Sequence, residues 1–151
     1  MNHRLLLDEY DMIIIAPSLF SDALHPLINH KNSVGIETTL KTVESIYDEY
    51  EGRDNAEQIK YFIKHALDEW HINYAMIVGN KELVPVRYSH IHSSSGGPSN
   101  FITDLYYADV YNDQGAFCSW DSNGNNLFGE MNDNEIIDHV DLYPDVCIGR
   151  L

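Results

Sequence analysis

The chain has 151 residues, of which 44% are hydrophobic and 11% aromatic, so it is long and apolar enough to fold around a core. The formal net charge of −15 argues against a nucleic-acid partner, because phosphate contacts require Lys and Arg, and against binding to an anionic membrane surface. Two cysteines, Cys118 and Cys147, do not make a disulfide scaffold, and no apolar run is long enough to span a membrane.

The first predicted elements are a buried strand and a helix. "MIIIA", Met12–Ala16, is a short continuous apolar run, typical of a strand that is buried on both faces. A helix is predicted over residues 21–34, and Gly35 fits its C-terminal cap. Pro26 counts against this helix, because proline is tolerated only near the first turn.

The next segments continue the alternation of strands and helices. "IETTLKTV", residues 36–43, alternates like an outer strand, and "YAMIVG", residues 74–79, resembles a second buried strand. Between them, Asp54 and Glu57 form a capping box. Apolar residues then recur at helical spacing and predict the clearest helix of the chain: Ile59, Phe62, Ile63, Ala66, Leu67 and Trp70.

This order predicts an α/β fold, with a mainly parallel sheet and helices on both faces. We expect one domain over residues 1–151, with Met12–Ala16 and residues 74–79 adjacent at the sheet's centre. Residues 36–43 should flank the first of these strands, and residues 146–150, within "DVCIGR", should flank the second.

Residues 92–145 have a different character and are predicted to be an acidic insertion of loops and strands. We expect "HSSSGGPSN", residues 92–100, to be a flexible loop and "TDLYYADVY", residues 103–111, to be a strand. Residues 88–149 contain no Lys or Arg but hold ten carboxylates: Asp104, Asp109, Asp113, Asp121, Glu130, Asp133, Glu135, Asp138, Asp141 and Asp145. The carboxylates of such a segment repel one another unless cations bind among them. The alternative is that they form a solvated acidic surface.

The usual α/β active sites are missing. The turn after the first strand, "APSLFSD", has no glycine-rich phosphate-binding pattern, and the strand ends lack the carboxylates of a phosphoacceptor. Cys147 is predicted to be an inert core residue, and carboxylates near Cys118 should raise its pKa. "HIH", residues 90–92, places two imidazoles on one strand face without a clear third zinc ligand, which favours a surface pair.

"WDSNGNNLFGE", residues 120–130, is a candidate calcium loop. Asp121, Asn123 and Asn125 alternate as oxygen ligands of calcium do, and Leu127 offers a backbone oxygen. The loop is not an EF-hand, because Asn126 replaces the glycine and Asn132 the final glutamate. Glu130 would complete the set of calcium ligands, or Asp104 or Asp109 from a neighbouring strand would do so. The alternative is an Asn/Gly-rich turn that satisfies its own backbone.

Five phrases in order resemble the gingipain-type cysteine peptidases, whose fold is caspase-like. They cover nearly the whole chain: Lys31 with Gly35 and Ile36; "YAMIVGNKELVPVR", residues 74–87; "TDLYYADV", residues 103–110; "WDSNGNNLFGE"; and "DLYPDVCIGRL", residues 141–151. One departure is Asn80, where the family commonly has Asp, and a lost carboxylate there would weaken a cation site near that strand end.

The resemblance implies a non-catalytic role for this chain. The family's catalytic His and Cys lie beyond the "GRL" phrase, and the His is followed by Gly, whereas none of the eight His here precedes a Gly. The chain therefore resembles the amino-terminal supporting half of a peptidase, whose partner is the carboxy-terminal catalytic subdomain. Family members are mostly exported, and several bind calcium. A stand-alone acidic binding module remains the alternative.

Overall fold

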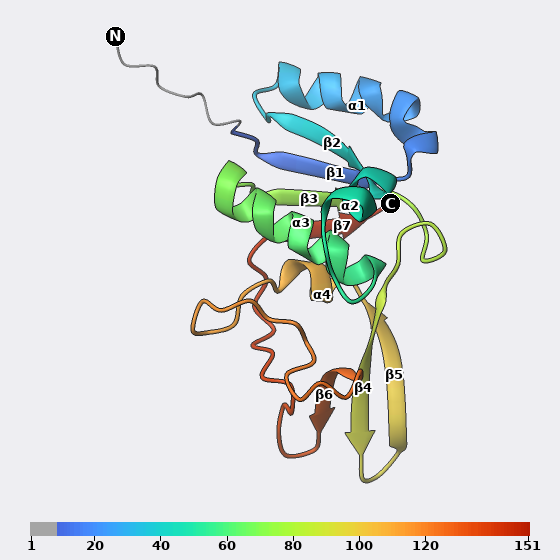
Figure 1. Ribbon diagram of the computed structural model, residues 1–151, viewed down its shortest axis with the longest axis vertical. Coiled ribbons are helices and arrows are strands. Elements are labelled where there is room, and N and C mark those ends of the chain that lie inside the picture. The colour runs from blue at the N-terminus through green and yellow to red at the C-terminus, as the bar shows by residue number, and fades with distance from the viewer. Residues whose placement is uncertain (1–8) are drawn as a thin grey trace.

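The computed structural model describes residues 9–151, which form two sheets and flanking helices (Figure 1). Sheet A contains four parallel strands in the order β2-β1-β3-β7, and sheet B contains three strands in the order β5-β4-β6. The elements in chain order are β1 (Met12–Ala16), η1 (Ser18–Phe20), α1 (Ser21–Ser33), β2 (Thr38–Thr42), α2 (Val43–Glu49), α3 (Asn55–Trp70), β3 (Tyr74–Ile77), β4 (Arg87–Ser93), β5 (Gly97–Thr103), α4 (Leu105–Ala108), β6 (Phe128–Asn132) and β7 (Cys147–Arg150).

The predicted centre and flanks of sheet A are confirmed. β1 and β3 are neighbours, with Met12 opposite Tyr74, while β2 and β7 form the two edges. The three isoleucines of β1 are fully buried, because both faces of this central strand are covered. The chain is therefore a mainly parallel α/β fold, as the sequence predicts.

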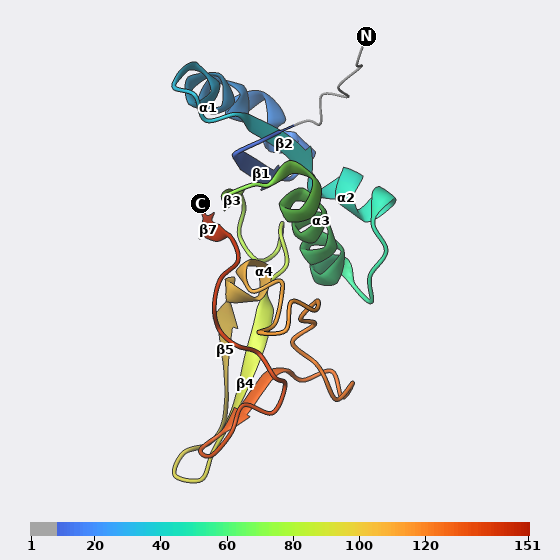
Figure 2. The ribbon, with the colours of Figure 1, turned by 90° about the vertical axis from the view of Figure 1, so that its left-hand side faces the viewer.

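Helices cover the two faces of sheet A, which Figure 2 shows along a second direction. On one face, Leu24, Leu27 and Ile28 of α1 pack against Ile14 and Val78. On the other face, α2 and α3 join the larger core cluster, in which Ile46, Ile59, Phe62 and Ile63 are fully buried. Because alternate residues of each strand point to opposite faces, β1 contributes Ile13 and Ile15 to this second cluster.

The termination of α1 follows the expected glycine rule. The N–H of Ile36 donates to the carbonyl of Lys31, and the N–H of Gly35 donates to that of Asn32, which is a Schellman motif. Gly35 has a φ of 82°, a left-handed conformation that glycine adopts without strain. Pro26 lies inside α1, well beyond its first turn, so the expected objection to this helix is wrong.

The N-terminus of α3 departs slightly from the predicted capping box. The side chain of Asp54 accepts a hydrogen bond from the N–H of Glu57, as expected. The Glu57 carboxylate, however, accepts from the N–H of Arg53 at 2.7 Å and from its guanidinium at 2.8 Å. This shift by one residue fixes the Arg53 side chain beside the helix end.

Two expectations for the second half are wrong. Residues 92–100 are not a loop, because β4 and β5 pair antiparallel from Arg87 opposite Thr103 to Ser93 opposite Gly97, and only residues 94–96 form the turn. Residues 103–111 are not a strand, because they contain α4. The adjacent Tyr106 and Tyr107 are both fully buried in one core cluster, which a helical turn permits and a strand with opposite-facing neighbours does not.

The core of sheet A continues into the second half of the chain. The same cluster that contains Phe62 also contains Tyr106, Trp120, Phe128 and Val140. Sheet B extends away from sheet A, with its hairpin at the opposite end of the molecule from α1 (Figures 1 and 2). Over the part of the chain that the structure describes, no helix is long and apolar enough to cross a membrane.

Candidate functional site

The loop over residues 120–130 is built around two carboxylates. The side chain of Asp121 is fully buried and accepts hydrogen bonds from Arg53 Nη1 at 2.5 Å, from the N–H of Asn125 at 3.0 Å and from that of Asn126 at 3.2 Å. Glu130 accepts from the amide groups of Asn123 at 3.1 Å and Asn125 at 2.6 Å. The two carboxylates therefore accept hydrogen bonds from N–H groups of the loop itself, and Asp121 also accepts one from the distant Arg53.

The backbone of the loop is shaped by close approach to Trp120. Gly129 has a φ of 56°, and a Cβ at this position would lie 2.8 Å from the indole ring of Trp120. The N–H of Gly129 also donates to the carbonyl of Trp120 at 2.6 Å. Only glycine fits both constraints, so the "FGE" phrase serves to place Glu130 beside the asparagines.

The electrostatic consequence appears at Glu130. Hydrogen bonds from Asn125 and Asn123 hold the pKa of the Glu130 carboxyl below its ordinary value. His92 Nε2 lies 3.3 Å from Oε1 of the same group. The two imidazoles of the "HIH" phrase therefore diverge in environment: His92 approaches the loop, whereas His90 Nδ1 is buried without a hydrogen-bond partner in residues 9–151.

The other two predicted ligands form no hydrogen bond with Asp121, Glu130 or the asparagines of the loop, and only Asp109 contacts residues 120–130, through Trp120. Asp104 forms a bidentate pair with Arg150, with both N–O distances at 2.7 Å. Asp109 is fully buried in the core, where its Oδ2 accepts from Trp120 Nε1 at 2.8 Å. These carboxylates were expected near the loop because a strand was predicted over residues 103–111. The structure has α4 there instead, with Asp104 at its N-terminal end and Asp109 at its C-terminal end.

In the loop as folded, hydrogen-bond donors and a cation face the oxygens that a calcium ion would use. Calcium requires six to eight oxygen ligands, but the oxygens of Asp121 and Glu130 already accept from N–H donors, and the Arg53 cation contacts Asp121. Leu127 donates its N–H to Asn125 Oδ1 at 2.8 Å, which occupies one lone pair of that amide oxygen. Within residues 9–151, no three His, Cys, Asp or Glu side chains are arranged to hold a metal ion.

Two charged groups, Lys60 and Asp109, are buried in the same part of the core. Lys60 is fully buried, and its ammonium donates to the carbonyl of Cys118 and lies 4.3 Å from the ring centre of Tyr106. Burial lowers the pKa of Lys60 and raises that of Asp109, although each charge partly offsets the shift of the other. Lys60 was not predicted as a core residue, although it lies beside Ile59 on the buried face of α3.

The cysteines show no nucleophile–base arrangement. Cys118 is buried, and burial is the main cause that raises its thiol pKa, with smaller contributions from Asp109 and Asp141. Cys147 is exposed, so the expectation of a core residue is wrong. β7 is an edge strand, and its alternation directs Cys147 to the uncovered face. Among the hydrogen bonds of residues 9–151, none joins a cysteine thiol to a histidine ring.

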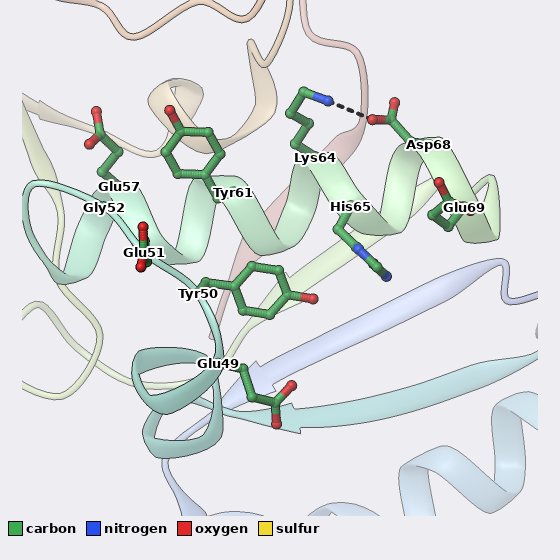
Figure 3. A pocket seen from close by; sticks show the side chains of 10 residues that line it. All are labelled: Glu49, Tyr50, Glu51, Gly52, Glu57, Tyr61, Lys64, His65, Asp68 and Glu69. Atoms are coloured by element: carbon green, nitrogen blue, oxygen red, sulfur yellow. Dashed lines mark hydrogen bonds and ion pairs between the residues drawn. The ribbon is translucent and has the colours of Figure 1, made fainter.

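Two of the surface hollows among residues 9–151 bear on the function. A cleft of about 640 Å³ lies between the chain after α2 and the outer side of α3 (Figure 3), and Glu49, Glu51 and Glu69 are among its carboxylates. A groove of about 480 Å³ lies on the face of β3 and β7 that α1 leaves open. It is lined by backbone and side-chain atoms that include Met12, Ile36, Met76, Cys147 and Leu151.

Comparison with known protein families shows the family to which the chain belongs. The model of peptidase family C25 matches residues 6–151. The chain belongs to peptidase family C25. Its membership agrees with the phrase order of the sequence and with the parallel sheet described above, whereas no curated protein sequence matches the chain.

Two solved structures of the gingipain RgpB share the fold of this chain. The complex of the RgpB pro- and mature domains of Porphyromonas gingivalis has a TM-score of 0.52 and 20% identity, over 84% of this chain and 26% of that chain. The Arg-specific cysteine proteinase gingipain R (RgpB) has a TM-score of 0.53 and 19% identity, over 87% of this chain and 26% of that chain. This family C25 chain thus spans about a quarter of the structures that it matches.

Proposed function

We propose that this chain is the amino-terminal supporting subdomain of a gingipain-type cysteine endopeptidase, and that the catalytic His and Cys belong to a carboxy-terminal subdomain of the same protein. Membership of peptidase family C25 supports the proposal, as does coverage of only 26% of each matched gingipain chain. The buried, high-pKa thiol of Cys118 supports it too, because a nucleophilic cysteine needs an accessible thiolate and a base.

The observation that carries the proposal is the open side of β7. This strand pairs with β3 on one side only, and within residues 9–151 its other edge has no strand partner. Unpaired edges and apolar grooves of this kind are normally covered by another element. The groove beside it offers Met76, Cys147 and Leu151 as apolar contacts for a second subdomain.

The supporting role would be to hold the β7 edge rigid. Arg150 donates to the carbonyls of Gly79 at 2.8 Å and Val84 at 2.9 Å, in addition to its pair with Asp104. These bonds fix the C-terminal end of β7 to the loop after β3 and to α4. Substrate selection and peptide cleavage would then belong to the other subdomain, and export to the cell surface or medium is part of the same proposal.

The first test is the gene sequence beyond the codon for Leu151. A His-Gly loop and a later Cys would support the proposal, and a stop codon would contradict it. The protein test compares the 151-residue chain with the longer product in a thiol-activated peptidase assay. We expect no cleavage by the short chain, with or without Cys118→Ala, and reduced cleavage by the longer product when Cys147→Glu places a charge on the open face of β7.

A stand-alone acidic binding module is the second candidate, and the cleft of Figure 3 is the observation that favours it. Its carboxylates outnumber its single lysine, Lys64, which is already paired with Asp68 at 2.6 Å. Such a surface would attract cationic partners. A module of this kind would keep its β7 edge solvent-exposed. The N–H of Cys147 already donates to Asn73 of the β3 side, so the N–H groups that alternate with it, of Ile148 and Arg150, face the open edge. Fast exchange of these two amides in the complete natural protein would favour the module over the peptidase subdomain.

A further inference from the structure

The loop over residues 120–130 contains the single Asn-Gly pair of the sequence, Asn123–Gly124. In such a pair the backbone nitrogen of the glycine can attack the side-chain amide carbon of the asparagine, because no Cβ lies beside the attacking nitrogen. This reaction is one reason why asparagine is a thermolabile residue. Every other asparagine of the chain precedes a residue that carries a side chain, so the sequence distinguishes Asn123 from all of them.

The structure leaves the attacking nitrogen free. Asn123 and Gly124 are both exposed, and apart from the chain neighbours of Gly124 no heavy atom lies within 4 Å of the position that a Cβ would take there. Among the hydrogen bonds of residues 9–151, none uses the N–H of Gly124. This N–H can therefore lose its proton to solvent water without first breaking a bond to the protein.

The side chain of Asn123 is held by two hydrogen bonds. Its Oδ1 accepts from the N–H of Asn125 at 3.0 Å, and its Nδ2 donates to Oε2 of Glu130 at 3.1 Å. A donor on Oδ1 withdraws electron density from Cγ and stabilises the negative charge that forms on this oxygen when a nucleophile attacks. The fold therefore activates the amide carbon that lies next to the free nitrogen in the chain.

We propose that Asn123 is a self-modification site, at which the backbone nitrogen of Gly124 displaces the side-chain amide of Asn123 as ammonia. The Gly124 nitrogen loses its proton and bonds to Cγ of Asn123, the Cγ–Nδ2 bond breaks, and Nδ2 leaves as ammonia with one added proton. The cyclic imide that results then takes up one water molecule. Opening at Cγ gives an aspartate, and opening at the backbone carbonyl gives an isoaspartate, so no oxidant or second protein is needed.

The product reverses the polarity of one contact in the loop. Asn123 donates to Glu130, whereas a carboxylate in its place can only accept, so two anions would face each other where the hydrogen bond of 3.1 Å now lies. Residues 88–149 contain no Lys or Arg, and the guanidinium of Arg53 is already bound to Asp121. The added charge is therefore uncompensated, and the modification is a slow, one-way switch that loosens the loop from β6.

Peptide mapping by mass spectrometry tests the proposal. The folded chain is incubated near neutral pH, well below its melting temperature, and each asparagine is followed with time. We expect Asn123 to become a mixture of aspartate and isoaspartate, whereas Asn125 and Asn126, which are also exposed in this loop but precede larger residues, remain amides. Conversion of all three at the same rate, or of Asn123 only after unfolding in urea, would overturn the proposal.

Two variants test the chemistry. Asn123→Gln keeps the amide but lengthens the side chain, so that attack requires a larger ring, and Gly124→Ala keeps the N–H but places a Cβ beside it. Both should lose the conversion. Gly124 has a φ of 75°, which strains alanine, so Asn123→Gln keeps the test valid if Gly124→Ala distorts the loop. Ammonia release from Asn123→Gln at the wild-type rate would contradict the assignment to Asn123.

The consequence is tested with Asn123→Asp, which is the product of opening at Cγ. We expect a lower melting temperature than that of the wild type, and a difference that shrinks as salt screens the added charge. The matched control is Asn100→Asp, which adds the same charge at an exposed position of β5 and should leave the melting temperature nearly unchanged. Equal melting of Asn123→Asp and wild type at low salt would show that the loop tolerates the charge, and the switch would be wrong.

Discussion

Arg53 Nη1 lies 2.5 Å from Oδ2 of Asp121, so a residue in front of α3 provides the positive charge for a loop 68 positions later in the chain. The same guanidinium donates to Glu57 at 2.8 Å and lies 5.2 Å from the ring centre of Phe128. One arginine therefore joins the N-terminal end of α3, the acidic loop and the first residue of β6. The acidic segment lacks a cation of its own, and this contact brings one from the first half.

Arg53→Ala should destabilise the fold by about 2 kcal/mol, because it leaves the buried Asp121 carboxylate without its cation. The loss is less than that for a fully buried pair, because Arg53 is partly exposed and two backbone N–H groups still bind Asp121. Denaturant unfolding measures the change. The control is Lys41→Ala, which removes a surface pair with Glu49 and should cost well under half as much.

Calcium binding by the loop over residues 120–130 remains a prediction from the sequence. An ion there would have to displace the Arg53 guanidinium from Asp121, so we expect calcium to raise the melting temperature of Arg53→Gln more than that of the wild type. Calcium at 100 times its dissociation constant would stabilise a binding protein by about 2.7 kcal/mol. Identical melting in millimolar calcium and in excess chelator, for both proteins, would contradict calcium binding.

The sequence predicted sheet A because its signals are local and strong. Met12–Ala16 is a continuous apolar run, and the helix after Asp54 carries both a cap and an apolar stripe, so no distant contact is needed to recognise them. The parallel order follows from the alternation of strands and helices, which leaves few ways to connect them.

The second half was predicted poorly because its structure depends on distant contacts. Tyr106 and Tyr107 form a helical turn since both fill one core cluster, and nothing in their own sequence distinguishes this turn from a strand. In the candidate loop, Asp121, Asn123, Asn125 and Glu130 lie together. Their sequence spacing could not reveal Arg53, whose charge changes what the loop can bind.

Asp54→Ala should destabilise the fold by about 2 to 3 kcal/mol at neutral pH, since it removes both the N-cap of α3 and the bidentate partner of Arg87. Arg87 would remain buried, with its guanidinium 3.9 Å from the ring centre of Phe128 but without a carboxylate. Asp54→Asn keeps the cap and loses the charge, so it should be less harmful. Urea unfolding of the two variants separates the contributions.

The same pair predicts how stability changes in acid. Burial alone would raise the pKa of Asp54, but hydrogen bonds from Arg87 and from the N–H of Glu57 outweigh it and lower the pKa below the unfolded value. A lowered carboxyl pKa gives stability that is present above the unfolded pKa of about 3.9 and is lost as the pH falls through the folded pKa. The stability difference between wild type and Asp54→Asn should therefore shrink in acid. A constant difference would contradict this assignment.

Lys60→Met should become less favourable relative to wild type as the pH rises. Burial lowers the pKa of Lys60 to about 7, below its unfolded value of about 10.4. Between these two values the unfolded Lys60 binds a proton that the folded one does not, so the wild type gains stability as the pH rises through this range. The Met side chain has no such dependence on pH. Without the Lys60 charge, Asp109, whose pKa burial already raises, should have a still higher pKa, which penalises the variant at high pH. Both effects lower the stability of Lys60→Met relative to the wild type as the pH rises.

Urea unfolding of wild type and Lys60→Met at several values between about pH 6 and about pH 10 measures this difference. We expect the variant's relative stability to fall steadily across the range. The double variant Lys60→Met with Asp109→Asn is the control, because it removes the carboxylate that depends on Lys60 and should show a weaker fall. A flat difference for Lys60→Met would mean that the Lys60 ammonium is solvated, and that its burial against Tyr106 and Cys118 does not govern its charge.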